Sequence, residues 1–148
     1  MKLKEQLDRD LRSAMREGDR VCRDTLRMVL AAVKQVEVDT QTALDDEGVQ
    51  GVLQKEAKKR QEAIEDFTRA GKAESAEGER AELAVIERYL PQQASPEEIE
   101  ARAREIIAQR NLSGPKAIGE VMRPLLDEFR GRADGRAVNE IVRRLLSS

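Results

Sequence analysis

The stretch GPKAIGEVMRPLLDEFRGRADGRAVNEIVRRLL, residues 114–146, combines helix-forming segments with tight turns. It contains two motifs, Gly119-Glu120-Val121-Met122 and Gly131 to Asn139, and arginines gather around the second. Apolar residues recur at spacings of three and four on both sides of Gly131, which is the pattern of helices that bury one face. The stretch therefore predicts short amphipathic helices joined by a glycine turn, within an all-α fold.

Proline and glycine set the predicted limits of these helices. A helix is expected to begin near Pro115, and Pro124 should bend it or end its first half because proline has no backbone N–H. Gly131 is predicted to follow the helix in the left-handed conformation. Asp134 is predicted to cap the last helix by accepting a backbone hydrogen bond.

Upstream of this stretch, Ser95-Pro96-Glu97-Glu98 carries three agreeing signals for the start of another helix. Ser95 is the expected N-cap, Pro96 occupies the first helical position, and Glu98 is expected to return the capping-box bond. Residues 91–148 are thus predicted to form three helices.

Residues 1–90 show four further amphipathic segments. Helices are predicted over about 3–17, over a segment beginning after Asp19, over 46–70 and over 73–90, with a polar loop at 39–46. The first carries an apolar stripe at four-residue spacing, Leu3, Leu7, Leu11 and Met15. The second has the most apolar seam and is the expected core, with Cys22, Leu26, Val29, Val33 and Val36.

Pro91 predicts a domain boundary, because proline cannot continue a helix and disfavours helical geometry at Leu90. A polar link, Gln92-Gln93-Ala94, follows it. The expected architecture is all-α, with an N-terminal four-helix domain, residues 1–90, followed by a smaller three-helix C-terminal domain, residues 91–148.

Composition supports this fold class and limits the functions. Of the 148 residues, 38% are charged and only 2% aromatic, which does not suit a β-sandwich. The net charge of −2 argues against a protein that coats nucleic acid by charge alone. The charge is uneven: residues 1–90 hold 17 basic and 20 acidic side chains, whereas residues 91–148 hold 10 and 9.

The single cysteine, Cys22, cannot form an internal disulfide, which suits a reducing compartment. No stretch approaches the roughly 20 apolar residues of a membrane span. The first residues lack the apolar core of a secretory signal. From these observations a cytoplasmic location without membrane contact is expected.

The residues show no catalytic constellation. Histidine is absent, which removes the commonest neutral-pH base and metal ligand. Cys22 lies on the apolar seam and is interpreted as a packed thiol. Asp45-Asp46-Glu47 is interpreted as charge at a helix N-terminus rather than a metal cluster. No phosphate loop or dinucleotide motif occurs. No catalytic residue, metal or cofactor is therefore expected.

Basic side chains in the last third of the chain are the candidate site. They could contact phosphate, since arginine can form two bonds to one phosphate group. The alternative is a solvated face on which Asp127, Glu128 and Glu140 neutralise them. The candidates are Lys116, Arg123, Arg130, Arg132, Arg136, Arg143 and Arg144.

Five short motifs appear in an order that resembles the YqeY family, small bacterial proteins named together with the B subunit of the tRNA-dependent amidotransferase. The motifs are Thr25-Leu26-Arg27-Met28, Lys59-Arg60-Gln61-Glu62-Ala63-Ile64, Glu87-Arg88-Tyr89-Leu90-Pro91, Gly119 to Met122, and Gly131 to Asn139. The resemblance covers nearly the whole chain, but it does not include the kinase-like catalytic half of the amidotransferase subunit.

The resemblance implies a helical domain followed by a three-helix tail that helps hold tRNA, chiefly at its outer corner. Two positions depart from the family pattern. Glu120 stands where the family often has a basic residue, and Ala133-Asp134-Gly135 stands where the amidotransferase tail usually reads Ala-Asn-Pro. Both departures lower the local positive charge or alter the helix cap. They weaken the inference that this chain binds RNA as the family's tail does.

The leading hypothesis is an accessory tRNA-binding protein of tRNA amidation or aminoacylation, with a tRNA synthetase or amidotransferase component as a second partner. The family label, carbon–nitrogen ligase activity with glutamine as amido-N-donor, is interpreted as inherited, because this chain lacks the catalytic parts. A rival hypothesis is a helical protein-interaction adaptor with no RNA role. A third is a small enzyme that uses carboxylates and arginine.

Overall fold

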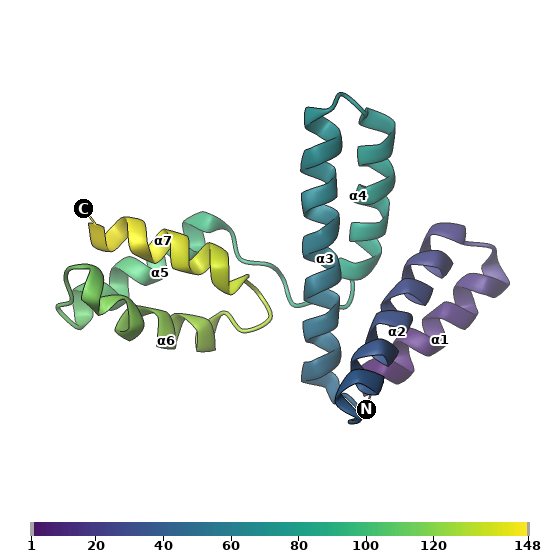
Figure 1. Cartoon of the computed structure of the whole chain (residues 1–148), viewed down its shortest axis with the longest axis horizontal. Helices are drawn as coiled ribbons and strands as arrows, with labels where there is room; N and C mark the ends of the chain where they lie inside the picture. Colours follow the sequence, from purple (N-terminus) through teal and green to yellow (C-terminus); the bar gives the residue numbers. More distant parts are fainter. Residues whose placement is uncertain (1, 148) are drawn as a thin grey trace. The chain divides into compact units, whose positions relative to one another are not determined.

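The computed structural model describes residues 2–147, and this part of the chain is helical and contains no strand (Figure 1). The prediction of an all-α protein is therefore confirmed. The helices are α1 (Lys2–Glu17), α2 (Arg20–Thr40), α3 (Asp46–Arg69), α4 (Ala73–Glu87), α5 (Pro96–Gln109), the 3-10 helix η1 (Pro115–Ala117), α6 (Ile118–Glu128) and α7 (Gly135–Ser147).

Contacts divide the chain into two compact units, residues 1–90 and residues 91–148. The first unit contains α1 to α4, in which α3 packs along α4 and α1 packs along α2. The second contains α5, η1, α6 and α7. Each unit has its own cluster of buried apolar side chains. Independent folding of the two units remains a prediction.

The turn between α1 and α2 is built as its residues predict. Gly18 has a φ of +74°, a left-handed conformation that glycine adopts without the steric cost of a Cβ. Asp19 then caps α2, since its Oδ1 accepts a hydrogen bond of 3.1 Å from the Cys22 N–H. This cap places the Cys22 side chain at the start of the buried seam of α2.

The core of the first unit follows the predicted seam of α2. Leu26, Val29 and Val33 are fully buried there. On α1 the predicted stripe is wrong at its end: Leu7 is buried, whereas Met15 is exposed and Ala14 is buried instead. A repeat of four residues overruns the 3.6-residue helical turn, so the stripe has rotated out of the core by its last member.

On α3 the core includes charge that the apolar pattern did not predict. Arg60 is only 6% exposed, and Glu56 is 7% exposed. Their side chains form an ion pair of 2.7 Å inside the unit. The pair lies one helical turn apart on the face that also carries Leu53 and Ala57, so its burial follows from helix geometry.

Pro96 begins α5 as expected, but only half of the predicted capping box forms. Ser95 Oγ accepts a hydrogen bond of 3.1 Å from the Glu98 N–H. The Glu98 carboxylate instead accepts from Arg132, at 2.9 and 3.1 Å. A charged donor from another part of the unit has displaced the local bond, since a charge-assisted bond is stronger than a neutral one.

Pro124 neither ends nor divides α6, which continues to Glu128. Proline leaves the carbonyl four residues earlier without its helical donor, and that carbonyl belongs to Glu120. The Arg110 guanidinium donates to this oxygen at 3.5 Å. A donor from the end of α5 thus partly replaces the missing backbone bond.

Gly131 has a φ of +78° and reverses the chain after α6, as predicted. Asp134 directly precedes α7, and its Oδ1 accepts a long hydrogen bond of 3.5 Å from the Arg136 N–H. The buried face of α7, Val138, Val142 and Leu146, packs against Val121 and Leu125 of α6 and the apolar face of α5. The charged side of α7 therefore remains at the surface.

Candidate nucleic-acid interface

Four of the seven candidate cations are exposed and have no side-chain partner among residues 2–147. Lys116 lies on η1, Arg123 on α6, and Arg136 and Arg143 on α7. None of the four side chains forms an ion pair or hydrogen bond with any residue from 2 to 147. Arg136 and Arg143 are two helical turns apart and share one face of α7, because seven residues nearly complete two turns.

The Arg132 side chain is held by hydrogen bonds within the second unit. Its Nε donates to the Gln92 carbonyl at 2.8 Å, and its Nη2 donates to both carboxylate oxygens of Glu98. The guanidinium also lies over the Phe129 ring, 5.3 Å from the ring centroid. These contacts tie the turn after α6 to the segment before α5, so a phosphate would have to displace them.

The remaining two candidates, Arg130 and Arg144, are paired at the surface. Arg130 lies 3.0 Å from Asp127, and Arg144 lies 3.4 Å from Glu100. Glu100 also holds Arg104 at 3.0 Å. Exposed pairs of this kind contribute about 0–1 kcal/mol, so a phosphate could compete for these arginines.

The neutralising carboxylates are only partly those predicted. Asp127 does pair with Arg130. Glu128 instead holds Arg102 at 2.7 Å, and Glu140 forms no ion pair with residues 2–147. The missed partners, Glu98 and Glu100, come from α5, more than 30 residues before the candidate arginines Arg132 and Arg144 that they bind. Nothing in local spacing signals such a pairing.

The local charge around the free cations is mixed. Arg123 lies on the exposed side of α6 between Glu120 and Asp127, one turn away in each direction. Glu140 lies between Arg136 and Arg143 along α7. An anion would therefore meet separate positive groups rather than a continuous basic stripe.

The residues described here offer little covalent or metal chemistry. Cys22 is buried, and burial, followed by the nearby Asp19 carboxylate, raises the pKa of its thiol. A raised pKa lowers the thiolate fraction and thus the reactivity of a cysteine. Residues 2–147 contain no group of three His, Cys, Asp or Glu side chains arranged to hold a metal ion. Within the same residues, no helix is both long and apolar enough to cross a bilayer.

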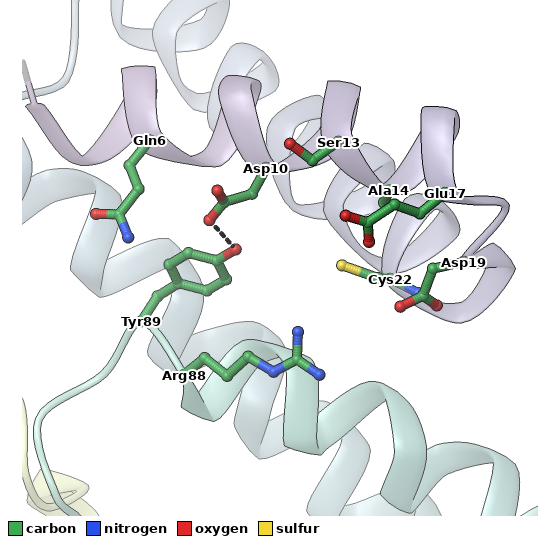
Figure 2. Close-up of a pocket in the computed structure, with 9 residues that line it drawn as sticks. All are labelled: Gln6, Asp10, Ser13, Ala14, Glu17, Asp19, Cys22, Arg88 and Tyr89. Carbon is green, nitrogen blue, oxygen red and sulfur yellow. Dashed lines mark hydrogen bonds between the residues drawn. The ribbon is translucent and has the colours of Figure 1, made fainter.

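Sequence reasoning missed a polar pocket in the first unit. It lies beside α1 and contains Asp10, Arg88 and Tyr89, of which the last two belong to the Glu87–Pro91 motif (Figure 2). The Tyr89 hydroxyl donates to Asp10 Oδ2 at 2.6 Å across 79 residues of sequence. The motif itself was the available signal, because it places Arg88 and Tyr89 side by side just after α4.

Several similar curated proteins carry the same name. The chain is 30% identical to the altered inheritance of mitochondria protein 41, mitochondrial, of Lachancea thermotolerans over 112 residues, which is 74% of this chain and 60% of that protein. It is 32% identical to the Kluyveromyces lactis protein of that name over 113 residues, again 74% and 60%. The Pyrenophora tritici-repentis protein is 27% identical over 128 residues, 86% and 71%.

These names contradict the expected cytoplasmic location, because they place the similar proteins in mitochondria. The expectation was wrong for a physical reason. A lone thiol indicates a reducing environment and not a particular compartment. The chain also spans only about 60% of the length of the first two relatives above.

The family is shown by a match along nearly the full chain. A family model described as Yqey-like protein covers residues 4–146, which takes in both compact units and all five motifs. The chain therefore belongs to the family of Yqey-like proteins.

Proposed function

We propose that this protein is an accessory RNA-binding protein and that its second unit binds the phosphates of structured RNA, best of all the corner of tRNA. The observation that carries the proposal is the set of exposed cations that form no ion pair with residues 2–147, namely Lys116, Arg123, Arg136 and Arg143. The only aromatic side chain of the unit, Phe129, is buried. Binding would therefore rest on phosphate contacts and not on base stacking.

The proposal takes residues 91–148 as a tail that folds by itself and holds RNA for a catalytic partner, such as a tRNA synthetase or amidotransferase component. Similarity to the tail of the amidotransferase B subunit supports this role. No autonomous carbon–nitrogen ligase activity is proposed, because the only thiol is buried and histidine is absent.

The test is fluorescence anisotropy with labelled tRNA, compared with an RNA duplex of equal length. With three or four phosphate contacts, log K should fall with log salt at a slope of about −3. Arg136→Ala and Arg143→Ala should each weaken binding and make the slope shallower by about one. Arg9→Ala is the matched control, since Arg9 is an exposed, unpaired arginine of the first unit.

Glu120 provides a test with the opposite sign. It is exposed one turn before Arg123 and adds negative charge to the proposed surface. Glu120→Lys should tighten tRNA binding, whereas Glu62→Lys on α3 should not. Wild-type binding without preference for tRNA at low salt, or unchanged binding by both arginine variants, would reject the RNA proposal.

One observation favours the adaptor alternative. Several large apolar side chains of the first unit are exposed, namely Met15, Val21, Met28 and Val38. Three of the four, Val21, Met28 and Val38, lie on α2. Exposed apolar groups mark a protein contact where they are contiguous and are otherwise common singly. A protein partner recovered by crosslinking in cells through the first unit, without any RNA, would support the adaptor in place of the RNA-binding protein.

A further inference from the structure

A pocket of about 360 Å³ opens in the first unit between α1, the start of α2 and the residues that follow α4 (Figure 2). This volume is at the lower end of the range for small-molecule sites, so it suits a small metabolite rather than a nucleotide. The proposed RNA surface lies in the other unit and uses none of the pocket residues.

Two small side chains form the buried floor of the pocket. Ala14 is 3% exposed and Cys22 is 6% exposed, and both line the space. A larger residue at either position would reduce its depth. Tyr89 lies beside them with its hydroxyl fixed by Asp10 Oδ2, so that wall has a defined position. The pocket thus has a preformed bottom and one preformed side.

One face of α1 supplies a row of polar groups. Gln6, Asp10, Ser13 and Glu17 are spaced by four, three and four residues, which places them along one side of the helix, and all four line the pocket. The Glu17 side chain forms no ion pair or hydrogen bond with residues 2–147. Its carboxylate is therefore available to a cationic ligand.

Arg88 provides the opposite charge. Its guanidinium extends into the pocket from the other side, facing the row on α1 and the cap residue Asp19 (Figure 2). It forms no ion pair with any carboxylate among residues 2–147. The guanidinium lies close enough to the Cys22 thiol to oppose the rise in the pKa of that thiol. It retains further N–H groups, and a guanidinium can hold a carboxylate through two parallel hydrogen bonds. The pocket therefore holds separated groups of both signs that do not neutralise each other directly.

From this arrangement we propose that the pocket binds a free basic α-amino acid. The ligand carboxylate would pair with Arg88, and its two cationic groups would lie against Asp10 and Glu17. Three carboxylates, including Asp19, face one arginine, so a ligand with net positive charge is favoured. A simple diamine lacks the carboxylate that Arg88 requires, and an acidic amino acid would add to the excess of negative charge.

The protein contains an intrinsic reporter for this site. Tyr89 is the only tyrosine and the chain has no tryptophan, so tyrosine emission reports on the pocket alone. Titration of the full chain with L-arginine should change this emission in a saturable way at millimolar concentration. Agmatine, which lacks the carboxylate, and 5-guanidinopentanoate, which lacks the α-ammonium, should each bind about tenfold more weakly.

Substitutions separate the two charged contacts. Arg88→Gln should weaken L-arginine binding about tenfold but should not weaken agmatine binding, because agmatine has no carboxylate for Arg88 to hold. Glu17→Gln should weaken both ligands. Glu87→Gln, at an exposed neighbour of Arg88 that does not line the pocket, is the control and should change neither. All three positions are exposed, and circular dichroism should show an intact helical fold.

Several results would overturn the proposal. No saturable change with L-arginine, equal affinity for agmatine, or unchanged L-arginine affinity in Arg88→Gln would each exclude an amino-acid site. Equal weakening by Glu87→Gln would show a general charge effect and would exclude it as well. These outcomes do not depend on tRNA binding, so failure here leaves the proposed function untouched, and the reverse also holds.

Discussion

At the scale of single residues, the least expected feature is the buried pair of Arg60 and Glu56. Arg60 Nη1 contacts Glu56 at 2.7 Å, and Arg60 Nη2 lies 3.2 Å from Met28 Sδ. Arg60 Nε and the fully buried Thr25 Oγ1 have no hydrogen-bond partner among the described residues. Arg60 and Met28 belong to the motifs at 59–64 and 25–28, so these two motifs are in contact in the first unit.

Arg60→Met should destabilise the protein by about 3 kcal/mol, because it leaves the Glu56 carboxylate buried without its main partner. The double variant Glu56→Leu/Arg60→Met should recover most of this loss, since no uncompensated charge then remains. Urea unfolding of the two variants and of Glu56→Leu alone measures the coupling. Additive effects of the single changes would contradict this account.

Tyr89 titrates above its ordinary range. Burial, followed by the hydrogen bond to Asp10, raises the pKa of the phenol because both favour its neutral form. The folded protein therefore holds this proton more tightly than the unfolded chain. The resulting stability is fully present below about pH 10 and is lost as the pH rises toward the folded-state pKa.

Absorbance titration should thus show the Tyr89 phenolate forming at higher pH in the folded protein than in urea. Asp10→Asn should lower this pKa by removing the charge that opposes ionisation. Asp8→Asn, on the same helix outside the pocket, should leave the titration unchanged. Identical curves for folded and unfolded protein would contradict the contact.

At the scale of elements, Glu37 links three segments of the first unit. Its carboxylate accepts from Lys4 Nζ of α1 at 2.8 and 2.9 Å and from the Leu44 N–H, before α3, at 2.8 Å. The bond from Lys4, followed by that from Leu44, lowers the pKa of Glu37. The end of α2, the start of α1 and the loop before α3 are thereby joined at one carboxylate.

Because the pKa of Glu37 is lower in the folded state, its contribution is present above the ordinary glutamate range, near pH 4, and is lost as the pH falls below it. Glu37→Gln should lower Tm at pH 7. Between about pH 5 and 3 the Tm of this variant should decrease less than the Tm of the wild type. Glu47→Gln, an exposed change at the start of α3, serves as the comparison. Parallel pH profiles for wild type and Glu37→Gln would refute this role.

At the scale of the whole molecule, the link between the two units is bonded to the second unit's own turn. The Ala94 N–H donates to the Arg132 carbonyl at 2.9 Å, and the Arg132 side chain holds the Gln92 carbonyl. The Gln93 side chain donates to the Gly131 carbonyl at 3.0 Å. Arg132 and its turn thereby order the segment that precedes α5.

Limited proteolysis with a protease of broad specificity should first cut within residues 90–95, the exposed polar link, and leave two resistant fragments. Arg132→Ala should speed this cut several-fold, because it releases the bonds to Gln92 and Glu98. Arg123→Ala, at an uncommitted arginine of the same unit, should not. First cleavage within residues 22–36 would reject the predicted boundary.

Local patterns in the sequence were sufficient for the helices and most of their limits. Periodicity located all seven α-helices, and Asp19, Ser95 and Gly131 act as predicted, because caps and turns depend on groups within a few residues of each other. The seam of α2 was also readable, since burial of one helix face needs only a repeating apolar pattern.

Only the tertiary structure decided which charged groups are available. The pairing of Arg132 with Glu98 and the bond from Tyr89 to Asp10 join residues that lie far apart in the sequence, and Arg60 is buried in the core of its unit. A charge interacts strongly only at a few ångströms, and local sequence does not set such distances between helices. The seven candidate cations are therefore alike in the sequence, whereas in the fold three of them form ion pairs and four have no ion-pair partner among residues 2–147.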